Sequence, residues 1–448
     1  MLGGTTMKYD IIVIGAGLAG LTAAYYLTKE RKKVLLIEKE KFLGGRTSSW
    51  NDNGMMIESG FHRHIGYYKE LPKLLKEVDV SLNTIVNWEK ELEIKTPEKP
   101  IILGIDPFHF PFPFIKGMIG NNKMLSLHDK MSLSKLFILG FKDYAFHPKT
   151  LDNDSILEYA EKKKITNNII ENVLTPLSTG IFFQPKDNYS SKLFFGIFYP
   201  SLSRLINIRI GAYKMGMSEA LANPIASKIR ENGGEILTNM KVESILFDGS
   251  KVTGVKLSNG SSIHSHNTIL ATDIGNAKRI VQNLVHIPFI QPFLKIPTTS
   301  AITVQLELKK PIQDFDRVTF APNTILASFT EESHTTFPKS KGRISIILSN
   351  PDDYLQKNNQ EIFQLVLKDF QKINLNIKKD VTDFRVVRHK DKFYNLGPNH
   401  DQDRPMQKTP IPGLVLAGDY TRQKFYTTME GAVLSGIAAA NIILKEKD

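Results

Sequence analysis

Apolar and polar positions change their pattern along the chain, and these changes mark the expected helices and strands. Residues 9–14 and 34–37 are mostly apolar and rich in β-branched side chains, which is typical of strands buried on both faces. Residues 18–29, which lie between them, have the pattern of a helix. A strand, a helix and a second strand in this order predict a βαβ unit, and we place it within residues 8–75.

Strand and helix patterns return after a long insertion. Residues 242–247 and 251–257 predict a hairpin around Asp248-Gly249, and residues 267–271 predict a further strand. The other predicted elements are helices near 152–175, 218–232, 360–373 and 430–445, and strands at 298–308, 343–348 and 414–417.

Six residues at the first strand–helix junction, Gly15-Ala16-Gly17-Leu18-Ala19-Gly20, form a glycine fingerprint. We expect Gly15 to permit the tight turn, Gly17 to let backbone approach a pyrophosphate, and Gly20 to let the helix pack on the strand. The helix N-terminus adds N–H groups and a positive dipole end. Glu38 ends the second strand 18 residues after Gly20, where a carboxylate accepts both hydroxyls of an adenosine ribose. The alternative, a glycine-rich turn without a ligand, is disfavoured by the strand, helix and acid together.

Two further stretches favour FAD over NAD. Gly44-Gly45-Arg46 brings backbone and a cation just beyond the ribose acid, so Arg46 is a candidate partner for a phosphate. Near the other chain end, Asp419 follows Gly418 and is a candidate partner for the sugar-alcohol chain of a flavin. The N-terminus of the last helix, near Glu430, can stabilise negative charge on a reduced flavin. The competing interpretations are a solvated surface arginine and a turn aspartate.

With these stretches in view, the sequence resembles FAD-dependent oxidoreductases of the amine oxidase type, and within them the plant and cyanobacterial phytoene desaturases. The segments that carry the resemblance are 58–68, 215–221, 233–237 and 416–436, and the last is the most specific to carotenoid desaturases. The resemblance implies removal of hydrogen from a hydrophobic polyene. It also implies FAD contacts at Glu38, Arg46, His62, Tyr68, Val242, Asp419 and Met429, with Val242 offering backbone to the adenine.

We therefore expect an α/β fold, in which a Rossmann-type, glutathione reductase-like FAD-binding domain of the amine oxidase type carries an inserted α+β substrate domain. The FAD-binding domain is expected to comprise residues 8–75, 218–290 and 410–448, and the substrate-binding domain residues 76–217 and 291–409. The full set of expected cofactor-binding residues is Gly15, Ala16, Gly17, Leu18, Ala19, Gly20, Glu38, Lys39, Gly45, Arg46, His62, Tyr68, Val242, Ala271, Gly418, Asp419, Met429 and Ala432.

The composition fits a large enzyme with a non-covalently bound flavin. A chain of 448 residues can bury a sizeable core and form two domains. Because it contains no cysteine, disulfides, thiolate metal sites, iron–sulfur clusters and a cysteinyl flavin link are excluded, and no metal site is predicted. No signal peptide is evident and no apolar run is long enough to span a bilayer. We expect a protein that is cytoplasmic or bound peripherally to the cytoplasmic face of a membrane.

The net charge of +12 indicates an anionic partner surface. No nucleic-acid motif accompanies it, so we expect no nucleic-acid partner and favour an anionic membrane surface. Residues 105–119 alternate phenylalanine with other residues among prolines, and residues 123–142 mix apolar side chains with lysines in a helical pattern. We expect residues 105–142 to contact a membrane. The alternative is a cap that packs on the substrate domain.

The substrate expected from the resemblance has no charged group, so its site should be a long apolar channel. Hydride removal requires a C–H bond held in position rather than a protein base, and we assign no catalytic residue. His62 and His64 are candidates for approach to the flavin, although packed histidines are commoner. The electron acceptor is expected to be a quinone or oxygen. Candidate channel residues are Phe108, Phe110, Phe112, Phe114, Phe182, Phe183, Phe194, Phe195, Phe198 and Tyr199.

Two departures from the related families bear on the substrate. Residues 300–304 lack the flavin-proximal lysine that the amine oxidase branch often carries in such a strand, which counts against amine oxidation. Residues 210–214 hold a tyrosine and a lysine where plant-type desaturases usually carry an arginine near the active site. The alternatives are therefore an oxidase of an amine or of a protoporphyrinogen-like substrate, and a flavin-binding protein without catalysis.

Overall fold

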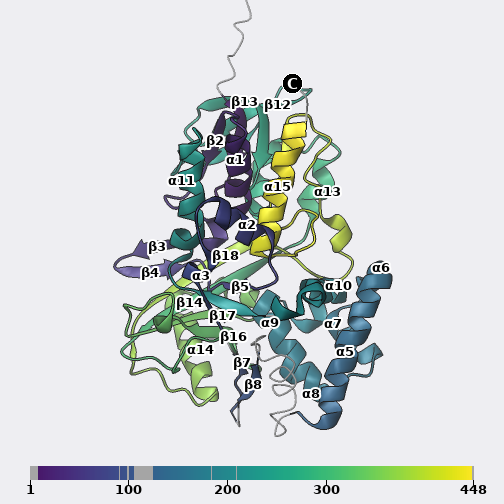
Figure 1. Ribbon diagram of the computed structural model, residues 1–448, viewed down its shortest axis with the longest axis vertical. Helices are drawn as coiled ribbons and strands as arrows, with labels where there is room; N and C mark the ends of the chain where they lie inside the picture. The colour runs from purple at the N-terminus through teal and green to yellow at the C-terminus, as the bar shows by residue number, and fades with distance from the viewer. Residues whose placement is uncertain are drawn as a thin grey trace, which may run out of the picture.

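The computed structural model describes residues 9–89, 91–97, 100–104, 125–182, 184–207 and 209–445. Its elements gather around two seven-stranded sheets, one in the upper half and one in the lower half of Figure 1. The membrane-contact segment predicted at 105–142 is described only from residue 125 onward, and Phe108 to Phe114 and Phe183 lie outside the described residues.

The first sheet has the strand order β10-β2-β1-β13-β12-β11, with β19 paired to β13. β10, β2, β1, β13 and β19 run parallel, while β12 pairs antiparallel with both of its neighbours. The parallel strands β1 and β2 are apolar and buried because helices cover them. The strands are β1 Tyr9–Ile14, β2 Val34–Ile37, β10 Glu235–Leu237, β11 Val242–Phe247, β12 Val252–Leu257, β13 Ser262–Leu270 and β19 Leu414–Leu416.

Three helices pack together beside this sheet, as Figure 1 shows. α1 (Leu18–Lys29) lies between α15 (Met429–Lys445) and α11 (Asn223–Glu231) and contacts both. The helix predicted at 218–232 begins with a short π-helical stretch, Ser218–Ala222, before α11. The expected Rossmann-type α/β architecture is confirmed, and it places the first and last helices of the chain side by side.

The second sheet has the order β18-β14-β17-β16-β15-β7-β8. Its longest strands are β14 (Thr298–Leu308) and β18 (Val381–Tyr394), which pair antiparallel. β18 is a 14-residue strand in a region where the sequence indicated no element. The other strands are β7 Glu91–Ile94, β8 Ile101–Gly104, β15 Thr319–Phe320, β16 Leu326–Glu331 and β17 Gly342–Leu348.

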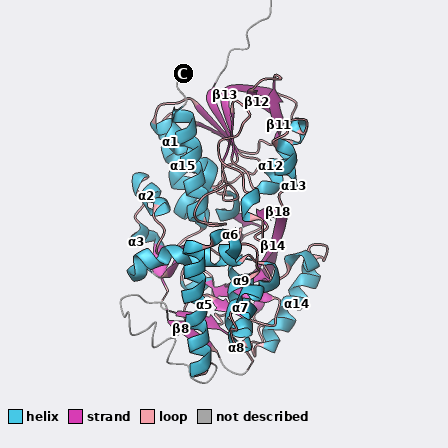
Figure 2. Ribbon diagram, turned by 90° about the vertical axis from the view of Figure 1, so that its right-hand side faces the viewer, coloured by secondary structure: helices cyan, strands magenta, loops and turns pink. Residues whose placement is uncertain are grey.

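Helices lie against this second sheet and below the first, as Figure 2 shows. α14 (Asn359–Lys372) packs on β16 and β18, and α9 (Thr175–Phe182) packs on β15 and β16. α5 (Leu127–Phe146) and α10 (Ser191–Phe198) pack against each other. The remaining helices are α2 Glu70–Glu77, α3 Leu82–Ile85, α6 Pro148–Leu151, α7 Ile156–Lys162, α8 Asn167–Ile169, α12 Ile274–Ile280 and α13 Ile290–Lys295.

Two small sheets connect the upper and lower parts. β3 (Ser49–Asp52) and β4 (Met55–Glu58) form a hairpin, and β9 (Ile210–Tyr213) pairs with both β5 (Arg63–Ile65) and β6 (Val86–Trp88). The segment between β4 and β5 thereby passes the carboxyl ends of β1, β2, β13 and β19. Ligands of open α/β sheets bind at such strand ends, so the fold places the candidate site there.

Candidate functional site

The junction between β1 and α1 requires glycine at two positions, once for backbone shape and once for close packing. Gly15 has a φ of +99°, and its N–H donates to the carbonyl of Ile37 at 2.8 Å. A Cβ on Gly20 would lie 1.9 Å from the carbonyl oxygen of Gly15, so α1 approaches the turn only without a side chain there. Gly17 precedes α1, and a Cβ on it meets no described atom closer than 4.0 Å. Gly17 also lines a cavity, so a side chain there would occupy ligand space.

Two backbone N–H groups fix the carboxylate of Glu38, which directly follows β2. Its Oε2 accepts a hydrogen bond from the N–H of Ala16 at 2.8 Å, and its Oε1 accepts one from the N–H of Glu40 at 3.0 Å. Burial raises the pKa of this carboxyl, while the two amides act in the opposite direction. Each oxygen keeps a second lone pair for a ribose hydroxyl. The arrangement fits the role predicted for Glu38.

Arg46 and Asp419 join the two ends of the chain. Arg46 Nη2 donates to Asp419 Oδ1 in a close ion pair, and the guanidinium lies 4.7 Å from the ring centre of Phe393. Gly418, at a φ of +144°, donates its N–H to Ser435 Oγ at 2.9 Å and so fixes the turn that carries Asp419. The structure thus pairs the residue predicted to meet a phosphate with the one predicted to meet the flavin side chain.

These motifs surround one cavity with a volume of about 640 Å³. All but two of the predicted cofactor-binding residues line it, among them Val242 and Ala271. The exceptions are Ala16, whose N–H binds Glu38, and Gly20, which packs against Gly15. A cavity walled by backbone at Gly15 and Gly17, by the Glu38 carboxylate and by the start of α15 fits a dinucleotide.

Histidines near the cavity are neutral because they are buried. His62 lines the cavity, its Nδ1 lies 2.6 Å from the carbonyl oxygen of Gly60, and burial lowers its pKa to about 4. His64 does not line the cavity. Its Nδ1 lies 3.0 Å from the hydroxyl of Tyr213, and burial lowers its pKa to about 3. Of the two histidines, His62 alone lines the cavity, as expected for a residue that approaches the flavin.

Glu430 has a structural role at the end of a neighbouring helix. Its carboxylate accepts hydrogen bonds from the N–H groups of Lys69, Glu70 and Leu71 at 2.7 to 2.9 Å, at the N-terminus of α2. The carboxylate does not line the cavity, whereas Met429 and Ala432 of the same helix turn do. The N-terminus of α15 therefore faces the cavity, and Glu430 ties α15 to α2.

The cavity continues away from the cofactor motifs into an apolar part formed by α9, α10 and the second sheet. Its lining there includes Leu177 and Ile181 of α9, Ile197 and Phe198 of α10, and Phe320 of β15. Of the described aromatic residues predicted for a channel, Phe198 lines the cavity. Phe194, Phe195 and Tyr199 do not: the first two are fully buried and pack with Phe137, and Tyr199 packs on Phe141 and Tyr144. That part of the channel prediction was wrong because the helix pattern does not tell a core face from a cavity face.

Several lining residues were missed by sequence reasoning. Arg209 directly precedes the segment 210–214, and its guanidinium lies 3.8 Å from the ring centre of Trp88. Arg63 lines the cavity and forms ion pairs with Glu89 and Asp316. His389, Lys392 and Phe393 come from β18. Their only signal was the mixture of aromatic and charged residues in 381–394, which does not identify a strand.

The fold and this cavity define a flavoprotein of the oxidoreductase class. Residues 18–444 match the family of flavin containing amine oxidoreductases, so the chain belongs to that family and is an FAD-dependent oxidoreductase.

Similar proteins include desaturases and an amine oxidase. The chain is 26% identical to a 15-cis-phytoene desaturase of an Oncidium hybrid cultivar, over 98% of this chain and 78% of that protein. It is 23% identical to the 15-cis-phytoene desaturase of Synechococcus elongatus, over 98% of this chain and 96% of that protein. Wild-type putrescine oxidase bound to putrescine has a similar fold, with a TM-score of 0.74, 17% identity, and coverage of 98% of this chain and 99% of that one.

Proposed function

We propose that this enzyme desaturates a hydrophobic isoprenoid of the carotenoid type, acting on CH–CH groups. The observation that carries the proposal is the charge distribution along the cavity. The acidic residues among its described lining are Glu38, Glu40, Asp273 and Asp419, and all four belong to or flank the cofactor motifs. The apolar part is lined by the aliphatic and aromatic side chains of α9, α10 and β15, and the lining cations Arg63 and Arg209 adjoin it in the β5–β9–β6 sheet region.

This distribution favours a polyene over an amine. An ammonium group is recognised by a carboxylate or an aromatic cage, and the described apolar part offers rings such as Phe198 and Phe320 but no carboxylate. β14 contributes Ala301 and Thr303 to the lining, so the segment 300–304 places no lysine there. Similarity to phytoene desaturases over nearly the whole chain supports the same substrate class.

The residues of the chain hold and orient rather than transfer protons in this proposal. When bound, FAD would supply the two-electron chemistry, taking up as reduced flavin both hydrogens that the polyene loses when the double bond forms. The apolar walls at Leu177, Ile181 and Phe320 keep the polyene in place and exclude water. The start of α15 directs its positive dipole end at the cavity, where it stabilises negative charge.

The test is anaerobic mixing of the oxidised enzyme, reconstituted with liposomes, with phytoene, putrescine or protoporphyrinogen. Loss of the flavin absorbance band with phytoene, together with a red-shifted polyene product, supports the proposal. Reduction of the flavin by putrescine or protoporphyrinogen alone would favour the corresponding oxidase alternative. No reduction by any of the three would favour a flavin-binding protein with another role.

A variant pair sharpens this experiment. Ile181→Asp places a carboxylate in the apolar part, so flavin reduction by phytoene should slow by an order of magnitude or more at unchanged FAD content. Ile138→Asp places the same group on an exposed position of α5, where it should leave reduction of detergent-dispersed substrate unchanged. Equal rates for the two variants would show that the polyene does not occupy the cavity near Ile181.

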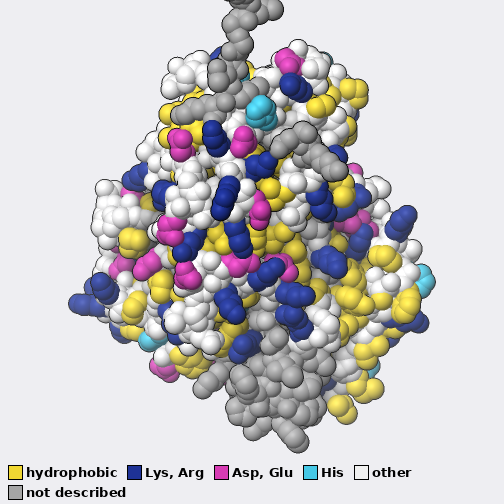
Figure 3. Space-filling view, turned by 45° about the horizontal axis from the view of Figure 1, so that its top comes forward, with side chains coloured by type: hydrophobic (Ala, Val, Ile, Leu, Met, Phe, Trp, Pro, Cys, Tyr) yellow, Lys and Arg dark blue, Asp and Glu magenta, His cyan; other side chains and the backbone are white. Residues whose placement is uncertain are grey.

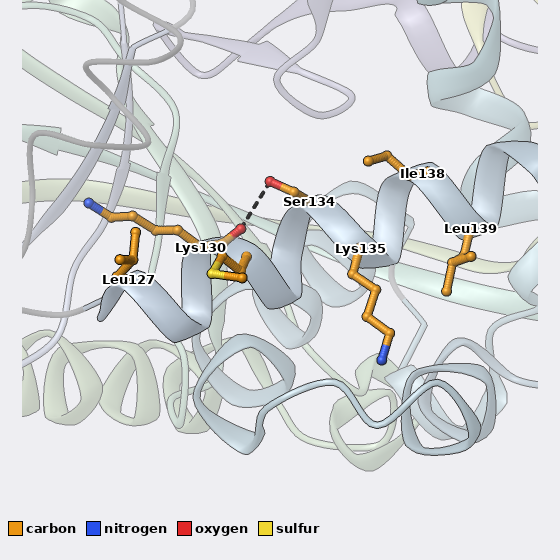
Figure 4. A pocket seen from close by; sticks show the side chains of 7 residues that line it. Leu127, Lys130, Ser134, Lys135, Ile138 and Leu139 are labelled. Atoms are coloured by element: carbon orange, nitrogen blue, oxygen red, sulfur yellow. Dashed lines mark hydrogen bonds between the residues drawn. The ribbon is translucent and has the colours of Figure 1, made fainter.

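We also propose that α5 contacts an anionic membrane surface. Its exposed residues Leu127, Met131, Lys135, Ile138 and Lys142 follow one stripe of the helix. In Figure 4 the labelled side chains project from this helix, and Ser134 Oγ donates to the carbonyl of Lys130 at 3.0 Å. In Figure 3 hydrophobic side chains gather near the edge where Figure 1 places α5, with Lys and Arg among them. Apolar side chains interleaved with lysines suit a lipid surface.

The opposite face of α5 packs on the protein, as the alternative interpretation required. Leu133 and Leu136 are buried, and Phe137 packs on Phe194 and Phe198. α5 is therefore a packed helix with an exposed apolar stripe. Within the described ranges, no helix combines the length and apolar character needed to cross a membrane.

Pelleting with liposomes tests the membrane proposal. The enzyme should pellet with anionic vesicles, less with neutral ones, and less again at about 1 M salt, where the screening length falls to about 3 Å. Met131→Ser with Ile138→Ser should reduce pelleting, while Val285→Ser, which alters an exposed apolar residue elsewhere, should not. Identical, negligible pelleting with both vesicle types would contradict the proposal.

A further inference from the structure

Lys392 is a lysine on the cavity wall whose charge is not balanced locally. It is partly buried on β18 and lines the same cavity as the glycine fingerprint. Within the described residues it forms no ion pair with a carboxylate, and its described hydrogen-bond partner is His389. The carboxylates of Asp273 and Glu40 act on it only at longer range. A cation placed in this way needs an anion from outside the protein.

Lys392 lies in an irregular stretch of β18. β14 pairs Thr299 with Phe393 and Ala301 with His389, so the two strands have different numbers of residues between these pairs. Lys392 falls within this bulge and lines the cavity. A bulge can re-aim a side chain relative to the regular strand.

His389 orients Lys392 without neutralising it. The Nε2 of His389 lies 2.8 Å from the carbonyl oxygen of Ser59, to which it can only donate. Its Nδ1 is therefore the acceptor, and Lys392 Nζ donates to it at 3.4 Å. Burial and the charge of Lys392 lower the pKa of His389 to about 4, so the imidazole is neutral. The ammonium keeps its full charge and two further N–H groups for a ligand.

The neighbours of Lys392 indicate which part of a ligand it meets. The charged groups that act on it are Asp273 at the start of α12, Lys39 and Glu40 just after Glu38, and Arg46. These residues flank the ribose acid Glu38 and the turn that is predicted to face the phosphates. Arg46 is already paired with Asp419, so of these two cations Lys392 is the one without a carboxylate partner among the described residues.

We propose that Lys392 binds the diphosphate of FAD, opposite the backbone of Gly17 and beside Arg46. The proposal extends the predicted cofactor site by a residue from the second sheet, and it makes β18 part of the flavin site. Burial lowers the pKa of Lys392, and a bound dianion would raise it again. Cofactor loading should then depend on the docking of the second sheet against the first.

The test compares Lys392→Met with Lys390→Met, which removes an exposed lysine of the same strand. In Lys392→Met the affinity for FAD should fall roughly tenfold to a hundredfold, the range for a hydrogen bond to a charged group. Holoenzyme of this variant should also release flavin at a lower temperature. Lys390→Met should match the parent in both measurements, and Lys392→Arg should recover most of the lost affinity.

Competition for the apoprotein identifies the ligand group. Lys392→Met should weaken binding of ADP, which carries the diphosphate, and leave binding of adenosine unchanged. In the parent protein, FAD affinity should fall as pH rises through the pKa of Lys392, because the neutral amine no longer attracts the phosphates. This fall should be smaller in Lys392→Met. Equal losses for ADP and adenosine, or FAD affinity equal to that of Lys390→Met, would overturn the proposal.

The result is separable from the proposed substrate. Every measurement here concerns flavin binding, so the outcome for Lys392 does not depend on whether phytoene or an amine reduces the flavin. Failure of phytoene to reduce a fully loaded enzyme would end the desaturase proposal and leave the role of Lys392 intact. If the parent desaturates phytoene but Lys392→Met keeps the parental FAD affinity, the desaturase proposal stands and the role proposed for Lys392 is wrong.

Discussion

Buried carboxylates have different partners beside the cofactor motifs and beside the second sheet. In the cofactor half, Glu38 and Glu430 bind backbone N–H groups, and each has its partners within one turn or one helix end. Where the second sheet meets β4 and β5, Glu58, Glu332 and Asp316 surround the buried guanidinium groups of Arg63 and Arg343. The first arrangement prepares a ligand site, whereas the second joins strands and loops that lie far apart in the chain.

The difference also appears in hydrogen bonding. Among the described residues, one oxygen each of Glu58 and Glu332 is buried without a hydrogen-bond partner, although both lie near arginines. Acids outnumber arginines in this cluster, so burial keeps protons on some of them. The amide-bound acids of the cofactor half need no counter-cation because N–H groups supply the partial charges. The buried acids thus depend on arginine side chains in the one arrangement and on backbone N–H groups in the other.

Arg343→Met should have the largest effect. The side chain is fully buried, pairs with Glu307 and hydrogen bonds to Gln305 and to the carbonyl of Met56. Its removal leaves buried acids without their cation, so the free energy of unfolding should fall by about 3–5 kcal/mol. Urea unfolding measures this. The control is Arg385→Met, a partly exposed pair with Asp52 that should lose about 0–1 kcal/mol.

Gly20→Ala should be the next most damaging change. Its Cβ would lie 1.9 Å from the carbonyl oxygen of Gly15, so α1 must shift and the free energy of unfolding should fall by roughly 1–3 kcal/mol. Gly17→Ala is the matched variant, because it has room beside Gly44 but lines the cavity. It should keep its unfolding midpoint without cofactor and lose FAD affinity. If both variants change stability equally, the two glycines do not have separate roles.

Sequence reasoning succeeded where partners are close in the chain. The turn glycines, the start of α1 and Glu38 follow one another within residues 15–38, and local backbone requirements make their pattern specific. Asp419 was also recognisable, because a short strand and a glycine precede it. The prediction that the two chain ends share one cavity followed from these motifs, and the cavity contains both.

The residues that were missed depend on register between distant strands. Lys392 lies within a bulge against β14 and lines the cavity, and no local pattern in 381–394 shows which side chains turn inward. Arg63 was within a recognised segment, yet its partners Glu89 and Asp316 lie on other elements. The pairing with Asp316 spans 253 residues, and a pairing over such a distance leaves no periodic signal. The aromatic channel prediction failed at Phe194 and Phe195 for a related reason, since a buried helix face and a cavity wall have the same composition.

Glu38→Ala should affect cofactor binding more than folding. The carboxylate accepts two backbone N–H groups and is predicted to accept ribose hydroxyls, and each bond to a charged group contributes roughly 1.5–3 kcal/mol. FAD affinity should therefore fall at least tenfold, as measured by quenching of flavin fluorescence. Glu30→Ala, which removes an exposed acid after the end of α1 and outside the cavity lining, is the control. Parental affinity in Glu38→Ala would show that Glu38 does not hold the ribose.

Glu332→Gln should leave the free energy of unfolding almost unchanged at acidic pH and alter it as the pH rises. Burial and the nearby Asp316 raise the pKa of Glu332 from 4.5 to about 8 in the native protein. The native state therefore binds more protons than the unfolded state between these values, so the stability that Glu332 contributes is complete below pH 4.5 and is lost as pH rises to about 8. The neutral amide resembles the protonated acid, so the variant should match the parent near pH 5 and be the more stable protein at pH 8. Urea midpoints at both pH values measure this, with the exposed Glu243→Gln as a control that should change neither. If the stability of Glu332→Gln falls with rising pH as much as that of the parent, the retained proton belongs to another acid of the cluster. Glu58 is the first candidate, because burial also raises its pKa and one of its oxygens is buried without a hydrogen-bond partner among the described residues.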